Sequence, residues 1–195
     1  MHRGPMRCLR PIAFALLAGC AHAESFEDGV LRKGDLTVRV GPVPGHWRRI
    51  HVDGADLAYR DDAREGSALF DVRCGHRDDD APLSILTQNL IMGTTQRDFE
   101  RQTLVPFDNR EAMHTLLRAK LDGVPMQYDI FVMKKDGCVH DLVYVAPPDR
   151  FAEGAADFER FAAGLHAYSG TSYVSSPRLG DARNGIAPKG SSRDP

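Results

Sequence analysis

Cys138 and His140 are the side chains with the most obvious chemical potential, because they lie two residues apart in an apolar segment. Residues two apart in a β-strand point to the same face, so a thiolate and an imidazole could meet there as a nucleophile and its base. The alternative is that Cys138 is bridged to another cysteine and that His140 is a half-buried strand residue. We favour this alternative. Since the Gly-x-Ser-x-Gly motif of serine hydrolases is also missing, we predict that the protein is not an enzyme.

A second group of potential ligands runs from Cys74 to Asp80, where His76 precedes the three consecutive aspartates Asp78 to Asp80. Carboxylates beside a histidine could bind a divalent cation. However, the spacing matches no EF-hand loop, and the side chains of consecutive residues point apart. A solvated loop in which Asp80 caps the following helix is the simpler interpretation. We therefore predict no metal site and, since no phosphate-binding glycine loop or dinucleotide fingerprint is present, no cofactor.

His46 and His51 bracket Trp47, Arg48 and Arg49. This cationic and aromatic segment could bind an anionic ligand. The interpretation that we favour is that Trp47 anchors the core and that the two arginines form a polar edge.

Residues 1–19 have the layout of a secretory signal peptide, with a basic start followed by the apolar run Ile12–Ala18. That run is too short for a membrane span, which needs about 20 apolar residues. Leu17–Cys20 resembles the lipobox of bacterial lipoproteins, which implies cleavage before Cys20 and acylation of its thiol. Several acyl chains would hold the protein stably on a membrane.

An alternative cleavage site is present at Ala21-His22-Ala23, an Ala-x-Ala pattern that would release a soluble protein beginning at Glu24. We favour the lipoprotein, with its domain in the periplasm. Ala21 follows the cysteine, which resembles the outer-membrane sorting rule of enteric bacteria, so the outer membrane is the favoured location in the cell envelope.

The charge of the mature chain argues against nucleic-acid binding. Cleavage removes three arginines and no acidic residue, so 22 basic residues remain against 27 acidic ones, a net charge of about −5. Nucleic-acid binding needs basic patches, and no strong basic stripe is present. We therefore expect the partners to be the membrane, through the lipid, and other envelope proteins.

Cys74 and Cys138 are the two cysteines left for pairing, because Cys8 leaves with the signal peptide and Cys20 takes the lipid. In an oxidising compartment such thiols tend to form a disulfide, so we predict a Cys74–Cys138 bond. The alternative is two separate buried thiols. The alternating pattern places Cys74 on the buried face of its strand, which favours a structural role for this residue. No Cys-x-x-Cys motif of a redox or zinc site is present.

The mature chain divides into a tether (20–33), one globular domain (34–168) and a disordered tail (169–195). The tail is rich in Ser, Gly, Pro, Asp and Arg and has too few large apolar residues to offset its ordering entropy. The domain is long enough for a single hydrophobic core.

Periodicity and turn residues predict an α+β domain in which a single antiparallel sheet packs with helices. Asp-Asn or Asp-Gly pairs beginning at Asp108, Asp122 and Asp136 mark hairpins. Ala112–Leu121 also fits a helix, but we choose a strand because the strand after the Asp122 turn needs an antiparallel partner. Predicted strands are Leu36–Val40, Trp47–Val52, Asp56–Arg60, Ser67–Cys74, Ala112–Leu121, Met126–Met133 and Cys138–Ala146; predicted helices are Pro82–Gly93 and Gly154–Tyr168, with a helical turn over Gln96–Arg101.

The Pro-Gly-x-Trp motif at Pro44–Trp47, together with the order of elements from Gly34 to Tyr168, resembles the fold of the PsbP proteins and the Ran-binding protein Mog1. That resemblance implies an αβα sandwich, and no functional residue of those families carries over. Lys120–Pro125 and Lys134–Val139 resemble uncharacterised envelope lipoproteins of Gram-negative bacteria, which often accompany transport systems.

We therefore expect a non-enzymatic, membrane-anchored accessory or interaction subunit of an envelope system. Two alternatives stay open. The domain could bind a small ligand in a pocket between sheet and helix. The less favoured alternative is an envelope enzyme that uses either Cys138 and His140 or a metal near Asp78–Asp80.

Overall fold

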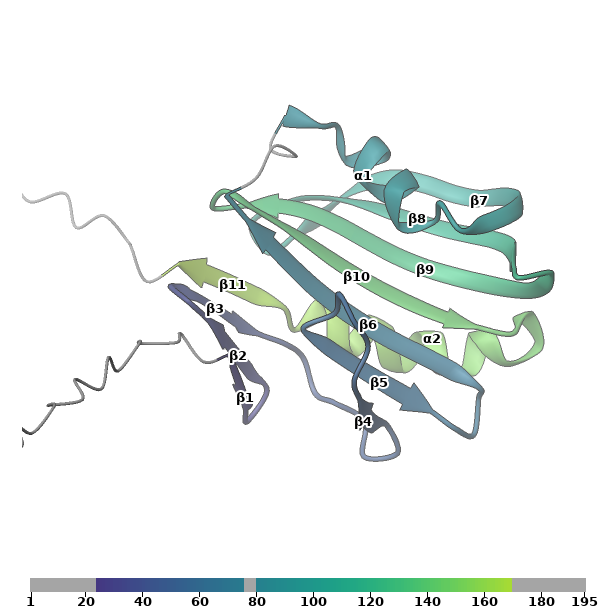
Figure 1. The fold of residues 1–195 in the computed structure, drawn as a ribbon, viewed down its shortest axis with the longest axis horizontal. Coiled ribbons are helices and arrows are strands. Elements are labelled where there is room, and N and C mark those ends of the chain that lie inside the picture. The colour runs from purple at the N-terminus through teal and green to yellow at the C-terminus, as the bar shows by residue number, and fades with distance from the viewer. Residues whose placement is uncertain (1–23, 76–79, 170–195) are drawn as a thin grey trace, which may run out of the picture.

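The structure is a computed structural model that describes residues 24–75 and 80–169 (Figure 1). The predicted signal peptide, the lipidation site Cys20, the tail from residue 170, and Asp78 and Asp79 all lie outside the described residues.

A seven-stranded antiparallel sheet forms most of the domain, in the order β4-β5-β6-β10-β9-β8-β7. Asp108-Asn109, Asp122-Gly123 and Asp136-Gly137 all have positive φ and form the predicted two-residue turns between its long strands. The strands are β4 (Arg48–Ile50), β5 (Leu57–Asp61), β6 (Gly66–Cys74), β7 (Thr94–Phe107), β8 (Arg110–Leu121), β9 (Val124–Lys135) and β10 (Cys138–Ala146).

A second, four-stranded sheet makes the single-sheet prediction wrong. Its order is β1-β2-β3-β11, built from β1 (Ser25–Glu27), β2 (Val30–Lys33), β3 (Leu36–Arg39) and β11 (His166–Ser169). The segment that we expected to be a tether therefore supplies two strands up to Lys33. Of these strands only β3 was predicted, as Leu36–Val40; β1, β2 and β11 are too short to show a recognisable pattern, and β11 pairs with β3 from the far end of the domain.

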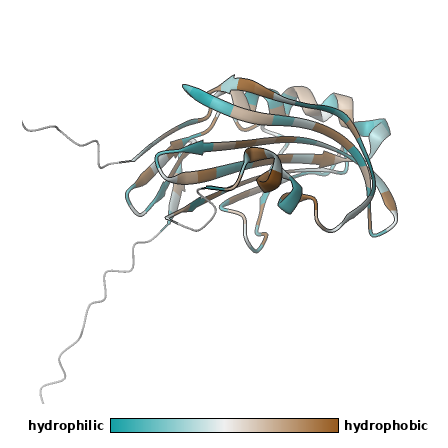
Figure 2. Ribbon diagram, turned by 90° about the horizontal axis from the view of Figure 1, so that it is seen from above, coloured by the Kyte–Doolittle hydropathy of each residue, from teal (hydrophilic) through white to brown (hydrophobic). Residues whose placement is uncertain are grey.

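The two helices of the described residues pack on opposite faces of the seven-stranded sheet (Figure 1). α1 (Leu83–Leu90) covers a smaller core, whereas α2 (Pro148–Ala163) and the four-stranded sheet share the larger core. Figure 2 shows hydrophobic and hydrophilic bands alternating along the strands. This is expected of a sheet whose two faces are each only partly covered. Neither helix has the length and apolar character that a membrane span needs.

Three local predictions need correction. Gln96–Arg101 is not a helical turn but part of β7, an edge strand whose exposed, charged residues show no strand alternation. α2 begins six residues before the predicted start and ends at Ala163. Asp80 does not cap α1, whose N-cap is Pro82 and has no side-chain cap.

Candidate functional site

A groove of about 800 Å³ lies between the four-stranded sheet and the β4–β5 edge of the main sheet. Its lining combines apolar and aromatic groups with three charged side chains. The residues are Phe26, Asp28, Gly29, Arg39, Val40, Gly41, Pro42, Val43, Arg49, Tyr59 and Gly164.

One wall of the groove depends on a close approach between Gly41, just after β3, and the end of α2. The Gly41 amide donates a hydrogen bond of 2.9 Å to the Phe161 carbonyl. A Cβ at position 41 would lie 2.2 Å from the Arg160 carbonyl oxygen, and one at Gly164 would lie 2.3 Å from the Gly41 Cα. Only glycine allows this contact, which fixes the loop after β3 against the helix.

Arg49 and two aromatic rings form the opposite wall. The Arg49 guanidinium carbon lies 4.8 Å from the centre of the Phe26 ring and 5.8 Å from that of Tyr59, distances typical of cation–π contacts. Its Nη2 donates a hydrogen bond of 3.1 Å to the Asp56 carbonyl. Burial raises the pKa of Tyr59, and the neighbouring Arg49 counteracts part of that rise, so Tyr59 lines the groove as a neutral phenol.

Trp47 lies behind this wall, and the structure confirms it as a core anchor. It is 7% exposed and contacts Tyr59 and Phe161 with ring centres 5.8 and 5.7 Å apart. Arg48 does not join Arg49, because its Nε pairs with Asp62 at 3.2 Å.

The charges of the groove favour an anion. Arg39 and Arg49 are opposed by Asp28 alone among the charged side chains that line it. A concave surface with apolar and aromatic walls and a few polar groups is the usual setting for a small ligand. The arrangement can therefore bind a molecule with an apolar body and an acidic group.

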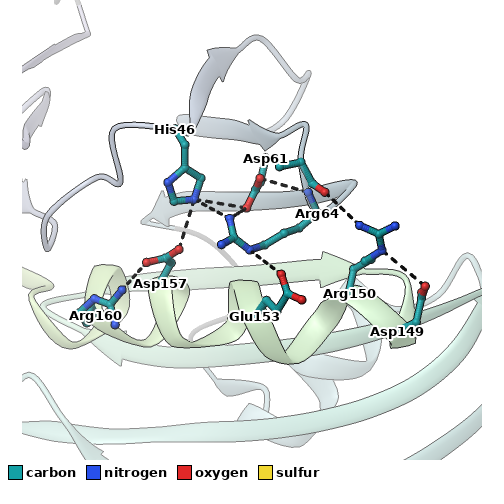
Figure 3. Close-up of polar contacts among 9 residues, drawn as sticks. His46, Asp61, Arg64, Asp149, Arg150, Glu153, Asp157 and Arg160 are labelled. Carbon is teal, nitrogen blue, oxygen red and sulfur yellow. Dashed lines mark hydrogen bonds and ion pairs between the residues drawn. The ribbon is translucent and has the colours of Figure 1, made fainter.

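A polar cluster fixes the loop between the groove and β4 (Figure 3). Arg64 Nη1 donates to His46 Nε2 at 3.0 Å and pairs with Asp61 Oδ2 at 3.1 Å. His46 Nε2 also lies 3.5 Å from Asp61 Oδ2 and 3.3 Å from Asp157 Oδ2, and Arg64 Nε lies 3.6 Å from Glu153. Because His46 and Arg64 contact carboxylates of both β5 and α2, this cluster holds β5, α2 and the loop together.

Tyr144 is a core residue that the sequence did not single out. Its side chain is 0% exposed, and its hydroxyl has no hydrogen-bond partner among the described residues. Burial raises its pKa to about 12, so it stays neutral. Its ring lies between Gly66 of β6 and Gly154 of α2, where an added Cβ would approach the hydroxyl oxygen to 2.6 and 1.7 Å.

The predicted Cys74–Cys138 disulfide is present and joins directly paired residues of β6 and β10. Cys74 shares the face of the buried residues of β6, but it ends the strand and is exposed rather than buried.

Cys138 thus has no thiolate to serve as a nucleophile. His140 is 0% exposed and stacks on Phe70 with ring centres 6.2 Å apart. Burial lowers its pKa to about 4, which is a poor match for a general base near neutral pH. The two residues that the sequence placed together do not form a reactive pair.

The metal alternative concerns residues that are only partly described. Asp80 is exposed, whereas His76, Asp78 and Asp79 lie outside the described residues. Within residues 24–75 and 80–169, no three His, Cys, Asp or Glu side chains gather as metal ligands. His51, the second histidine of the anion-binding alternative, pairs with Asp53 at 3.2 Å and does not line the groove.

No protein-family model and no curated protein matches this sequence, but solved structures match its fold. The solution structure of the cyanobacterial PsbP protein CyanoP from Synechocystis aligns with a TM-score of 0.51 and 14% identity, over 69% of this chain and 87% of CyanoP. The crystal structure of LpqN, which is involved in cell envelope biogenesis of Mycobacterium tuberculosis, gives a TM-score of 0.50 and 14% identity, over 70% and 86%. The yeast Ran-binding protein Mog1p aligns at 0.47 and 12% identity, over 68% and 90%. The chain therefore has the PsbP-like fold that the resemblance predicted.

Proposed function

We propose that this is a lipid-anchored protein of the bacterial cell envelope whose domain acts by binding and not by catalysis. The Cys74–Cys138 disulfide indicates an extracytoplasmic location, because such bonds persist in oxidising compartments. The lipobox at Cys20 supports the anchor. An envelope role also agrees with LpqN, which shares the fold and is involved in cell envelope biogenesis.

The observation that carries the binding proposal is the groove of about 800 Å³, which is lined by Arg39 and Arg49, with Arg49 against the rings of Phe26 and Tyr59. Its rings and the side chains of Val40, Pro42 and Val43 supply the apolar surface, and its two guanidinium groups supply charge-assisted hydrogen bonds to an acidic group. We propose that the ligand class is an apolar anion, such as a carboxylate or sulfonate with an aromatic or aliphatic body.

A titration with the anionic aromatic probe 1-anilinonaphthalene-8-sulfonate tests this proposal. Trp47 is the only tryptophan, so energy transfer from Trp47 to the probe reports binding, and the arginine variants show whether the groove is the site. We expect Arg49→Gln to weaken binding about tenfold through the loss of a charge-assisted contact. Arg39→Gln should have a similar effect.

Arg48→Gln is the matched control, because Arg48 neighbours Arg49 in sequence but pairs with Asp62 outside the groove. It should bind the probe as the wild type does. Equal affinities of the Arg48 and Arg49 variants, at unchanged melting temperature, would contradict the groove as the binding site.

The anchor has a separate test. Cys20→Ser should move the protein from the membrane fraction to the soluble periplasmic fraction. Unchanged membrane retention of the variant would exclude the lipid as the anchor, and cleavage after Ala23 would show as a wild-type N-terminus at Glu24.

We also propose protein partners in the envelope, as expected of an accessory subunit. Apolar side chains are exposed on α1 or just after it, on β7 and at the β8–β9 hairpin, where Leu121 and Val124 face each other at 40% and 56% exposure. Adjacent exposed apolar groups, as in this hairpin pair, often mark interaction sites. Leu121→Glu/Val124→Glu should reduce in vivo crosslinking to envelope proteins without loss of stability; an unchanged crosslinking pattern would exclude this hairpin. The exposed side chains are Ile85, Met92, Phe99, Leu104, Leu121 and Val124.

A further inference from the structure

The groove lies close in the chain to the lipid anchor at Cys20. Phe26 of β1 lines the groove, and Cys20 precedes it by six residues in the sequence. A chain advances at most about 3.6 Å per residue, so Phe26 lies within about 22 Å of an acylated Cys20. A globular domain of this size is roughly 40 Å across. The anchor therefore holds the groove on the side of the domain that faces the membrane.

The apolar wall of the groove is a fixed surface on which an acyl chain can lie. Val40, Pro42 and Val43 form this wall directly after β3. The Val40 amide donates a hydrogen bond of 2.9 Å to the Gly29 carbonyl, and the Gly41 amide holds the same segment against the end of α2. Because the backbone is fixed at both residues, binding does not have to order a mobile loop, which would cost affinity.

Arg39 and Arg49 are available for an anionic head group. Both side chains are exposed and line the groove. Within residues 24–75 and 80–169, neither of them forms an ion pair with a carboxylate. Asp28 is the opposing charge of the lining, so the balance is one positive charge. Guanidinium groups donate paired hydrogen bonds to phosphate oxygens, which suits a phosphodiester.

We propose that the groove takes its ligand from the membrane that anchors the protein, and that this ligand is a single-chain anionic phospholipid. The acyl chain lies on the apolar wall, and the phosphate accepts hydrogen bonds from Arg39 and Arg49. The volume of about 800 Å³ is typical of a site for one drug-sized molecule, so we assign one acyl chain. This inference rests on the proposed function. Anchoring in the membrane that contains the ligand raises the effective concentration of that ligand at the groove.

Competition between two lysophospholipids tests the ligand class. Native mass spectrometry of the Cys20→Ser protein with equimolar 1-oleoyl-lysophosphatidylglycerol and 1-oleoyl-lysophosphatidylcholine reports which lipid is bound. The anionic lipid should be preferred at least about tenfold, because the choline cation of the other offsets its phosphate charge. Arg39→Gln/Arg49→Gln should remove this preference. Arg48→Gln is the matched control and should keep it, since Arg48 pairs with Asp62 outside the groove.

Photo-crosslinking tests the membrane as the source of the ligand. Lipidated protein carries p-benzoylphenylalanine at position 42, where Pro42 is exposed and lines the groove. It is inserted into phosphatidylcholine vesicles that contain 1-oleoyl-lysophosphatidylglycerol as the minor lipid. We expect crosslinks to the anionic lipid, and their loss in Arg39→Gln/Arg49→Gln. Position 92 is the control site, because Met92 is 72% exposed and follows α1 on the opposite face of the main sheet.

Equal binding of the two lipids, a preference that persists in the double variant, or lipid crosslinks at position 92 in place of position 42 would overturn the proposal. If the crosslinking variant does not fold, the competition between the lipids still decides. Binding of 1-anilinonaphthalene-8-sulfonate that depends on Arg49, without binding of either lipid, would leave the proposed function intact and refute only this inference. Membrane retention of Cys20→Ser would instead refute the anchor.

Discussion

Replacing Gly154 of α2 by alanine should destabilise the protein, although alanine is the better helix former. An added Cβ would lie 1.7 Å from the Tyr144 hydroxyl oxygen and 2.6 Å from its Cζ, far inside the contact distance of about 3.5 Å. The ring cannot move away, because Gly66 of β6 contacts it on the other side, where a Cβ would lie 2.6 Å from the same oxygen.

The expected magnitude follows from two opposing effects. Alanine gains about 1 kcal/mol of helix propensity over glycine. Overpacking of a rigid core costs typically about 1–3 kcal/mol, and the short distances at Gly154 place this site at the upper end. We therefore expect Gly154→Ala to lower the free energy of unfolding by about 2 kcal/mol.

Tyr144→Phe should restore part of that loss, because it removes the atom closest to the new Cβ. On its own it should be nearly neutral, since the Tyr144 hydroxyl has no hydrogen-bond partner among the described residues. The rescue stays partial because the Cζ remains 2.6 Å from the Cβ position. Gly45→Ala is the control, as nothing lies within 4 Å of a Cβ there.

Urea unfolding followed by Trp47 fluorescence measures the wild type, Gly154→Ala, Tyr144→Phe, their double variant and the Gly45→Ala control. A Gly154→Ala protein as stable as the wild type would refute the packing argument. So would a coupling free energy between Gly154→Ala and Tyr144→Phe, from the double-mutant cycle, of less than about 0.5 kcal/mol.

Two further predictions concern the disulfide and His140. Replacing both Cys74 and Cys138 by alanine should lower the free energy of unfolding by about 4 kcal/mol, because the bond closes a long loop; a urea midpoint equal to that of the wild type would contradict this. Burial lowers the pKa of His140 to about 4, below the ordinary value near 6.5. Between these two pH values the unfolded chain binds more protons than the folded one. The free energy of unfolding is therefore unaffected by His140 above pH 6.5 and falls by up to about 3 kcal/mol as the pH is lowered toward 4. His140→Leu should flatten the stability profile in that range, and an unchanged profile would show that this histidine is not the cause.

The long hairpins were predictable because their turns are encoded locally. Asp122 and Asp136 each precede a glycine, and the two central residues of these turns have the positive φ that tight hairpins require. β10 was predicted from Cys138 to Ala146, its observed bounds, because it is apolar on both faces and ends at a proline. The disulfide followed from compartment and cysteine number, and the register of β6 and β10 places its cysteines opposite each other.

The second sheet, the groove and the packing glycines could not be predicted, because they depend on contacts between distant segments. The four-stranded sheet joins Ser25–Arg39 to His166–Ser169, and apart from β3, which was predicted, its strands are too short for a clear pattern. The groove follows from that sheet, so its lining could not be read from the sequence. The glycine of the Pro-Gly-x-Trp motif, Gly45, has open space around it. Packing requires glycine at positions 41, 66, 154 and 164, and no local signal distinguishes these glycines from the others.

The most direct test of the account is to map where an apolar anion binds. Two-dimensional ¹H–¹⁵N spectra of the protein titrated with 1-anilinonaphthalene-8-sulfonate should show the largest shifts at amides of the groove lining, such as Gly29, Gly41, Tyr59 and Gly164. These shifts should vanish in Arg39→Gln/Arg49→Gln. Shifts confined to the α1 face of the sheet, or shifts that persist in the double variant, would contradict the assignment of the groove as the binding site.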